Sequence, residues 1–147
     1  MRLRRRQTAQ STVELAIVLP SVVVGLLLVI GLGILGQAKA GVQAVADEAA
    51  RAGALTNTPA AAEAVGTDRA YRVAQGYGLD PGRLAVTIDT SDFQRGGTVS
   101  AEVDYRVPLH DLLPMIWGAD VPLSHTASEP IDAYRTGLPL TGDTSSP

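Results

Sequence analysis

The sequence predicts an α+β membrane protein, with a long N-terminal transmembrane helix extended into a stalk and a second helix packed on a small, about three-stranded antiparallel sheet. Three observations predict this fold class. Residues 15–36 are continuously apolar, residues 37–54 are rich in alanine, and residues 84–128 contain three segments with alternating apolar and polar side chains. The 147 residues suffice for one small domain besides a membrane anchor.

The apolar run at residues 15–36 reads LAIVLPSVVVGLLLVIGLGILG, with no charge and Ser21 as its only polar side chain. A helix of this length spans roughly 33 Å, which matches a hydrocarbon core of about 30 Å. Two alternatives are a signal peptide cleaved after Ala40 and a buried core helix. The run is longer than the apolar core of a signal peptide. The rest of the chain is too short to cover an apolar helix on all sides, so we expect a membrane anchor.

The charges are distributed unevenly along the chain. Four of the 12 basic residues precede the apolar run, whereas the segment from residue 37 onward carries eight basic and 14 acidic residues. The basic cluster predicts a cytoplasmic N-terminus and an exported C-terminal part. The acidic balance of the exported part argues against a nucleic-acid partner. Because the chain has no cysteine, disulfides, thiolate metal sites and cysteine nucleophiles are excluded.

Glu14 directly precedes the apolar run, so we expect it at the cytoplasmic interface. A carboxylate at that depth is costly unless it reaches water or has a partner. One explanation is structural: Glu14 would lie near a helix N-terminus capped by Ser11 or Thr12, where the helix dipole favours negative charge. The other explanation is a functional partner, and the surrounding residues bear on it.

Residues 4–20 read RRRQTAQSTVELAIVLP. This segment resembles the N-terminus of type IV pilin-like proteins, and most closely the TadE-like family of tight-adherence (Flp) pilus assembly proteins. In that family a basic leader ends in Gly, the fifth residue of the mature chain is Glu, and an apolar helix with an early Pro follows. The resemblance implies that Gln10 is the mature N-terminus and that Ala9, where the family has Gly, is the last leader residue. Pro20 matches the family's proline.

The resemblance also implies roles for residues of the apolar helix. Glu14 would register subunits by neutralising the Gln10 amine of a neighbour, since two charges in an apolar bundle are tolerated only as a pair. Pro20 removes one helical hydrogen bond and should kink or loosen the helix. Gly36 and Ala40 have a small-xxx-small spacing, which permits close contact between helices.

Beyond the apolar run, residues 37–55 are expected to continue the helix as a stalk, because alanine has the highest helix propensity. An ordinary exposed alanine-rich helix is the alternative to a packed one. A second helix is predicted from residue 59 or 60 to Gly76, ended by a glycine- and proline-rich segment. The expected apolar stripes are Val42, Val45, Ala49 and Ala52 on the first helix, and Ala62, Val65, Val73 and Ala74 on the second.

Three strands are predicted at Leu84–Thr90, Thr98–Val107 and Val121–Ser128, the first two joined by a hairpin loop at residues 92–97. The apolar connection at residues 109–117 could pack in the core or contact a partner or the membrane.

The domain division is a cytoplasmic basic leader (1–14), transmembrane helix (15–36), helical stalk (37–55), extracytoplasmic head (56–135) and disordered tail (136–147).

The chain offers few groups for catalysis. His110 and Asp111 are neighbours in sequence and make a poor dyad, and His125 falls in line with the apolar residues of its strand. Metal-ligand spacings, a nucleophile elbow and a phosphate loop are not found. We therefore expect no catalytic residues, no cofactor, no metal site and no enzymatic activity.

The sequence thus predicts a minor pilin or pseudopilin-like structural protein, anchored in a bacterial cytoplasmic membrane and acting in assembly of a tight-adherence pilus or a related secretion apparatus. Incorporation into a surface pilus is left open. The resemblance implies as partners the major Flp pilin, paralogous minor pilins, a prepilin peptidase, an inner-membrane platform and an assembly ATPase. The alternative is a membrane-tethered extracytoplasmic binding or regulatory module unrelated to pili. An exported enzyme is the third hypothesis.

Overall fold

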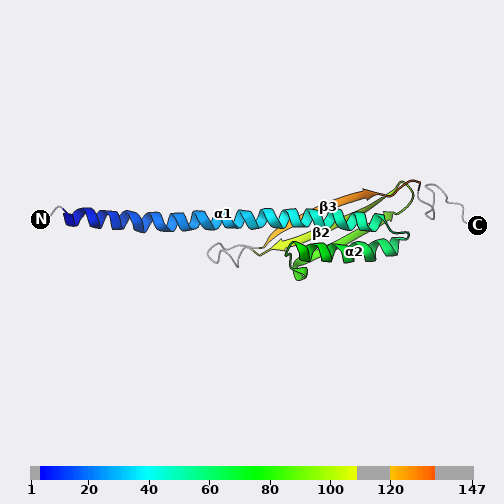
Figure 1. Cartoon of the computed structure of the whole chain (residues 1–147), viewed down its shortest axis with the longest axis horizontal. Coiled ribbons are helices and arrows are strands. Elements are labelled where there is room, and N and C mark those ends of the chain that lie inside the picture. The colour runs from blue at the N-terminus through cyan, green and yellow to red at the C-terminus, as the bar shows by residue number, and fades with distance from the viewer. Residues whose placement is uncertain (1–3, 109–119, 135–147) are drawn as a thin grey trace, which may run out of the picture.

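The computed structural model describes residues 4–108 and 120–134, with the side chains of Glu14 and of the residues from Ala16 onward. One long helix carries a head at its C-terminal end (Figure 1). Within the described residues the order is α1 (Arg4–Ala54), α2 (Pro59–Gly76), the 3-10 turn η1 (Pro81–Arg83), β1 (Leu84–Asp92), β2 (Thr98–Val107) and β3 (Val121–Pro130). The predicted α+β class is confirmed by this long apolar helix, second helix and three-stranded antiparallel sheet.

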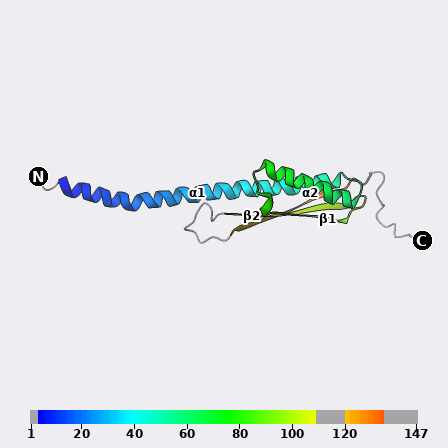
Figure 2. The same cartoon turned by 90° about the horizontal axis from the view of Figure 1, so that it is seen from below.

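Helix α1 has 51 residues, so it is roughly 76 Å long. It begins at Arg4 and not near residue 12, because neither glycine nor proline interrupts the leader; Ser11 and Thr12 are therefore inside the helix and are not its cap. The helix continues through Pro20, and its blue N-terminal part is bowed in Figure 2. The Ser21 hydroxyl donates to the carbonyl of Ile17 at 3.1 Å, which satisfies this polar group inside an apolar segment.

Helix α2 has well-defined signals at both ends. At its start, the Thr58 hydroxyl accepts a hydrogen bond from the N–H of Ala61 at 3.2 Å, and proline follows the cap. At its end, Gly78 adopts a φ of 70° and the N–H of Leu79 donates to the carbonyl of Ala74 at 2.9 Å. This Schellman geometry ends the helix and turns Leu79 into the core.

The sheet has the order β1-β2-β3, with both neighbouring pairs antiparallel. Strand β2 has the predicted bounds, whereas β1 and β3 each extend two residues further, to Asp92 and Pro130. In the loop between β1 and β2, a Cβ at Gly97 would lie 2.1 Å from the carbonyl oxygen of Asp92, so the loop requires glycine there. The carboxylate of Asp89 accepts the backbone N–H of Ser91 at 2.9 Å, which lowers its pKa.

Both helices cover the same face of the sheet: α1 packs over β2 and β3, and α2 packs over β1. On β2 the side chains alternate as predicted, with Val99, Ala101, Val103, Tyr105 and Val107 buried against the helices. The opposite face is polar and solvated. The predicted connection at residues 109–117, with His110 and Asp111, and the predicted tail at residues 136–147 lie outside the described residues.

The contact between α1 and α2 is lined by small side chains. Helix α2 buries Ala62, Gly66, Ala70 and Ala74. The expected apolar face of α2 is partly wrong, because Val65 is 43% exposed. A Cβ at Gly66 would lie only 3.1 Å from the carbonyl oxygen of Ala49, so the helices are too close for a larger side chain on this face. Of the stripe expected on α1, Val42, Val45 and Ala49 are buried in the head and Ala52 is half-buried.

Candidate functional site: the membrane half of α1

The membrane half of α1, defined as residues 16–36, exposes nearly all of its large apolar side chains. These exposed side chains are Ile17, Val18, Leu19, Val22, Val23, Val24, Leu26, Leu28, Val29, Ile30 and Leu32. A helix that is apolar around its circumference is stable in lipid or in a protein core. By length and composition, the segment Ala16–Ala54 contains a stretch able to cross a membrane. Such a helix near the N-terminus is consistent with a single-pass membrane anchor.

Three of the four glycines of the membrane half have no neighbours in the described part of the chain, whereas the fourth, Gly31, is buried. A Cβ added at Gly25, Gly33 or Gly36 would meet no other heavy atom within 4 Å. Gly36 and Ala40 are exposed and lie about one turn apart on the same side of α1. Among the described residues this surface is therefore both narrow and open, as close contact with another helix would require.

The remaining predicted site residues also lie on α1. Ala9 and Gln10 are within the helix, and Glu14, which is exposed, follows Gln10 by four residues. Residues four apart share one face of a helix, so Gln10 and Glu14 lie one turn apart on the same face. Pro20 follows further along the same helix. Leader processing at Ala9 and Gln10, registration by Glu14 and the effect of Pro20 remain predictions.

Polar chemistry is sparse in the head. His125 is half-buried on the helix-facing side of β3, opposite Val103 of β2. Residues 4–108 and 120–134 contain no group of three or more His, Asp or Glu side chains that could hold a metal ion. A polar contact between α1 and α2 is the ion pair between Glu48 and Arg69, with 2.6 Å between Oε2 and Nη2. This ion pair joins α1 to α2 on the surface of the head.

Sequence reasoning missed the glycines that set the distance between α1 and the head. A Cβ at Gly41 would lie 3.1 Å from Cβ of Tyr77, and one at Gly53 would lie 3.1 Å from Cγ1 of Val99. The signal that could have found this contact is the four-residue spacing of Ala62, Gly66, Ala70 and Ala74, which places small side chains along one ridge of α2.

The fold and the exposed membrane half define a class of protein: a chain with one N-terminal apolar helix, suited to anchor it in a membrane, that continues into a small α+β head. The sequence model of the TadE-like protein family matches residues 9–51, which confirms the resemblance to TadE-like proteins noted in the sequence. The matched stretch covers the membrane half of α1 and most of the helix beyond it. Curated proteins and solved structures yield no significant match.

Proposed function

We propose that this chain is a minor pilin or pseudopilin-like structural subunit that acts in assembly of a tight-adherence pilus or a related secretion apparatus, and that it is not an enzyme. The observation that carries the proposal is the open surface of the membrane half. Its glycines at positions 25, 33 and 36 meet nothing within 4 Å in the described chain. In lipid, apolar side chains give little driving force for helix association, so small residues and polar groups select the contacts.

Glu14 supplies the polar group in this scheme. If the leader is removed after Ala9, the new amine of Gln10 is a cation at the end of an apolar helix. In a parallel neighbour displaced by about one turn, roughly 6 Å, this amine reaches the level of Glu14. A carboxylate and an amine buried together are tolerated as a pair, whereas either one alone is strongly disfavoured. The pair would therefore fix the register of adjacent helices.

The proposed topology places residues 1–14 in the cytoplasm and the head outside the cytoplasmic membrane, because the arginines of the leader lie on one side of the apolar run. The proposed partners in the membrane are the major Flp pilin and paralogous minor pilins. A prepilin peptidase would act on the leader. The inner-membrane platform and the assembly ATPase would act from the cytoplasmic side of the membrane. The head would make the contacts that distinguish this subunit from others.

The test is a pair of substitutions that each remove one exposed carboxylate. Glu14→Ala should insert in the membrane and fold as the native chain does, but should lose pilus assembly, because the register of the helices is no longer set. Glu102→Ala is the matched control, since Glu102 lies on the solvated face of β2. Pili are counted by electron microscopy, and insertion is checked by membrane fractionation. Normal piliation with Glu14→Ala would remove the assigned role of Glu14.

A second measurement addresses leader processing and separates the pilin-like role from a simple tether. The N-terminus of the protein recovered from membranes is sequenced, with and without a prepilin peptidase. We expect a start at Gln10 only when the peptidase is present. A start at Met1 in both cases would argue against processing, and a start at Gly41 would show that the apolar run is a cleaved signal peptide and would overturn the anchor.

A further inference from the structure

The head begins before the apolar run of α1 has ended. Ile34 and Leu35 are half-buried and pack against the main core cluster of the head. Gly36 is the last residue of the apolar run. If the hydrocarbon boundary lies near Gly36, the headgroup region adds about 5–7 Å, or roughly four residues of helix, on the outer side. The end of the head that packs on residues 34–41 of α1 therefore lies at the depth of the lipid headgroups.

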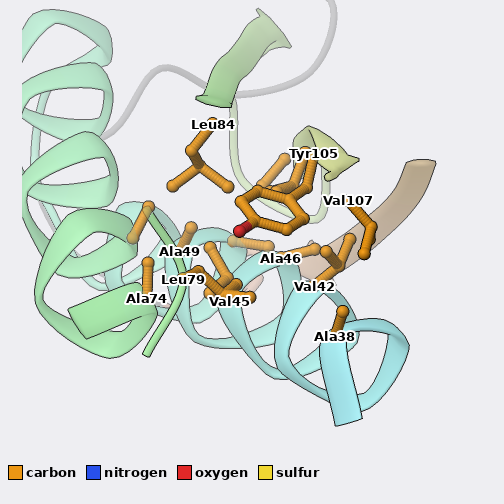
Figure 3. Packing of buried hydrophobic residues seen from close by; sticks show 14 residues of the cluster. Ala38, Val42, Val45, Ala46, Ala49, Ala74, Leu79, Leu84, Tyr105 and Val107 are labelled. Atoms are coloured by element: carbon orange, nitrogen blue, oxygen red, sulfur yellow. The ribbon is translucent and has the colours of Figure 1, made fainter. Parts of the chain in front are cut away.

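This end of the head contains a cavity of about 310 Å³, which we call the base cavity. It is open on one side and is formed by three segments that are far apart in the sequence. Figure 3 shows several of its walls, among them Ala38, Leu79, Tyr105 and Val107. The wall residues used here are Ile34 and Gln37 of α1, Tyr77 and Leu79 after α2, and Tyr105 and Val107 of β2.

The walls of the base cavity match the chemistry of a membrane interface. Ile34, Leu79 and Val107 give it an apolar lining, while two tyrosines contribute rings with polar tips. The Tyr105 hydroxyl accepts a hydrogen bond from the N–H of Asp80 at 3.3 Å, and Tyr77 is 42% exposed at the rim. Tyrosine is enriched where one end of the side chain meets apolar groups and the other meets water or headgroups.

The depth of the rim follows from the contact between Tyr77 and α1. A Cβ at Gly41 would lie 3.1 Å from Cβ of Tyr77, so Tyr77 is held against the helix at the outer edge of the headgroup layer. No charged residue is among the described residues that line the base cavity. A ligand at this place would therefore be recognised by its apolar part and not by the charge of its headgroup.

We propose that the base cavity binds the glycerol end and upper acyl chain of a phospholipid from the outer leaflet, and so seats the head on the membrane surface. The cavity is continuous with the apolar surface of the membrane half, because Ile34 belongs to both. Its volume is in the range of small-ligand sites, about 300–1,000 Å³. The proposal rests on the membrane anchor of the proposed function, but not on any pilus partner.

Site-directed spin labelling tests the depth of the rim, and the absence of native cysteines makes single-cysteine variants direct. The full-length chain is reconstituted in phosphatidylcholine vesicles with a nitroxide at Tyr77→Cys. Val65→Cys is the matched control, because Tyr77 and Val65 are 42% and 43% exposed. Val65 lies roughly 18 Å from Tyr77 along the axis of α2. Label 77 should be several-fold more accessible to oxygen than to a nickel chelate, with the reverse at label 65. Equal aqueous accessibility at both would overturn the proposal.

Photo-crosslinking tests occupancy of the cavity. Phosphatidylcholine with a diazirine high on its acyl chain should label peptides that contain residues 77–79 and 105–108, and Ala38→Phe should greatly reduce the labelling by filling the cavity. Gln43→Phe is the control, because Gln43 is exposed outside the lining. Labelling should be unchanged in phosphatidylglycerol vesicles. Circular dichroism checks that the variants fold. If Ala38→Phe does not fold, the spin labels still test the depth of the rim independently.

The alternative occupant is residues 109–119 of the same chain, which follow Pro108 at the wall of the base cavity. If this segment fills the cavity, label 77 is shielded from both oxygen and the nickel chelate, and no lipid crosslink forms. Replacing the segment by a glycine-serine linker should then change the accessibility of label 77 and the yield of lipid crosslink. That result would overturn lipid binding. Because the vesicles contain no other pilus component, failure of lipid binding leaves the proposed pilus function untouched, and failure of piliation leaves lipid binding untouched.

Discussion

The two halves of α1 both contain small residues, but these residues pack against the head in one half and are exposed in the other. In the outer half, residues 37–54, added Cβ atoms at Gly41 and Gly53 would lie 3.1 Å from atoms of the head. In the membrane half, added Cβ atoms at Gly25, Gly33 and Gly36 would meet nothing within 4 Å among the described residues. One continuous helix therefore has small-residue positions that the head occupies in the outer half, and others, Gly25, Gly33 and Gly36, that the described residues leave open in the membrane half.

The difference shows how the surrounding medium decides what small residues do. In water, burial of apolar surface drives α2 and the sheet onto the outer half, and small side chains set how closely they pack. In lipid this driving force between helices is absent, since acyl chains are as apolar as the side chains. The membrane half can therefore remain stable without a protein neighbour, and the proposed function assigns the choice of a specific neighbour to its glycines and to Glu14.

The largest expected effect comes from truncating one isoleucine in the head and, for comparison, one in the membrane half. Ile131→Ala removes a buried side chain that is 2% exposed and should lower the free energy of unfolding of the head by about 2–5 kcal/mol. Ile17→Ala is the matched control, since Ile17 is 68% exposed in the membrane half and should leave head unfolding unchanged. Both are measured by chemical denaturation of the full chain in detergent micelles. Equal losses would show that the two halves of α1 unfold as one unit.

A smaller effect is expected from filling the glycine positions. Gly66→Val should destabilise the head by about 1–3 kcal/mol, because the new side chain meets a backbone carbonyl, at Ala49, that cannot move aside easily. Gly33→Val should leave head unfolding unchanged. In cells, it should weaken co-purification with pilin-like subunits if the membrane half packs against them. Native unfolding behaviour of Gly66→Val would contradict the close approach of α1 and α2.

The smallest effect is expected at the ion pair between Glu48 and Arg69. Both side chains are more than a third exposed, so solvent screens the pair and its contribution should be about 0.2–1 kcal/mol. A double-mutant cycle with Glu48→Gln and Arg69→Met measures this coupling, which should shrink further at high salt. A coupling well above this range would mean that charge, as well as small side chains, fixes the position of α2 on α1.

Much of the molecule is determined by patterns local in the sequence. The apolar run predicts the membrane half because 22 uncharged residues form a helix in lipid whatever follows them. The alternation in residues 98–107 gives both the bounds and the buried face of β2, since the two faces of a strand are set by residue parity. The basic leader, Glu14 and the apolar helix with Pro20 together indicated the family resemblance, which the match over residues 9–51 confirms.

Only the tertiary structure decided which weakly apolar surfaces are buried. Eight of the 18 residues from 37 to 54 are alanine, and an alanine stripe has too little hydrophobicity to reveal whether a partner covers it. In the folded chain this stripe belongs to the main core cluster of the head. On α2 the sequence favoured Val65 for the inner face, but the close approach of α1 selects Gly66. The base cavity likewise depends on three distant segments that meet only when the helices cross the sheet, because contact geometry is not encoded in the local pattern of any one of them.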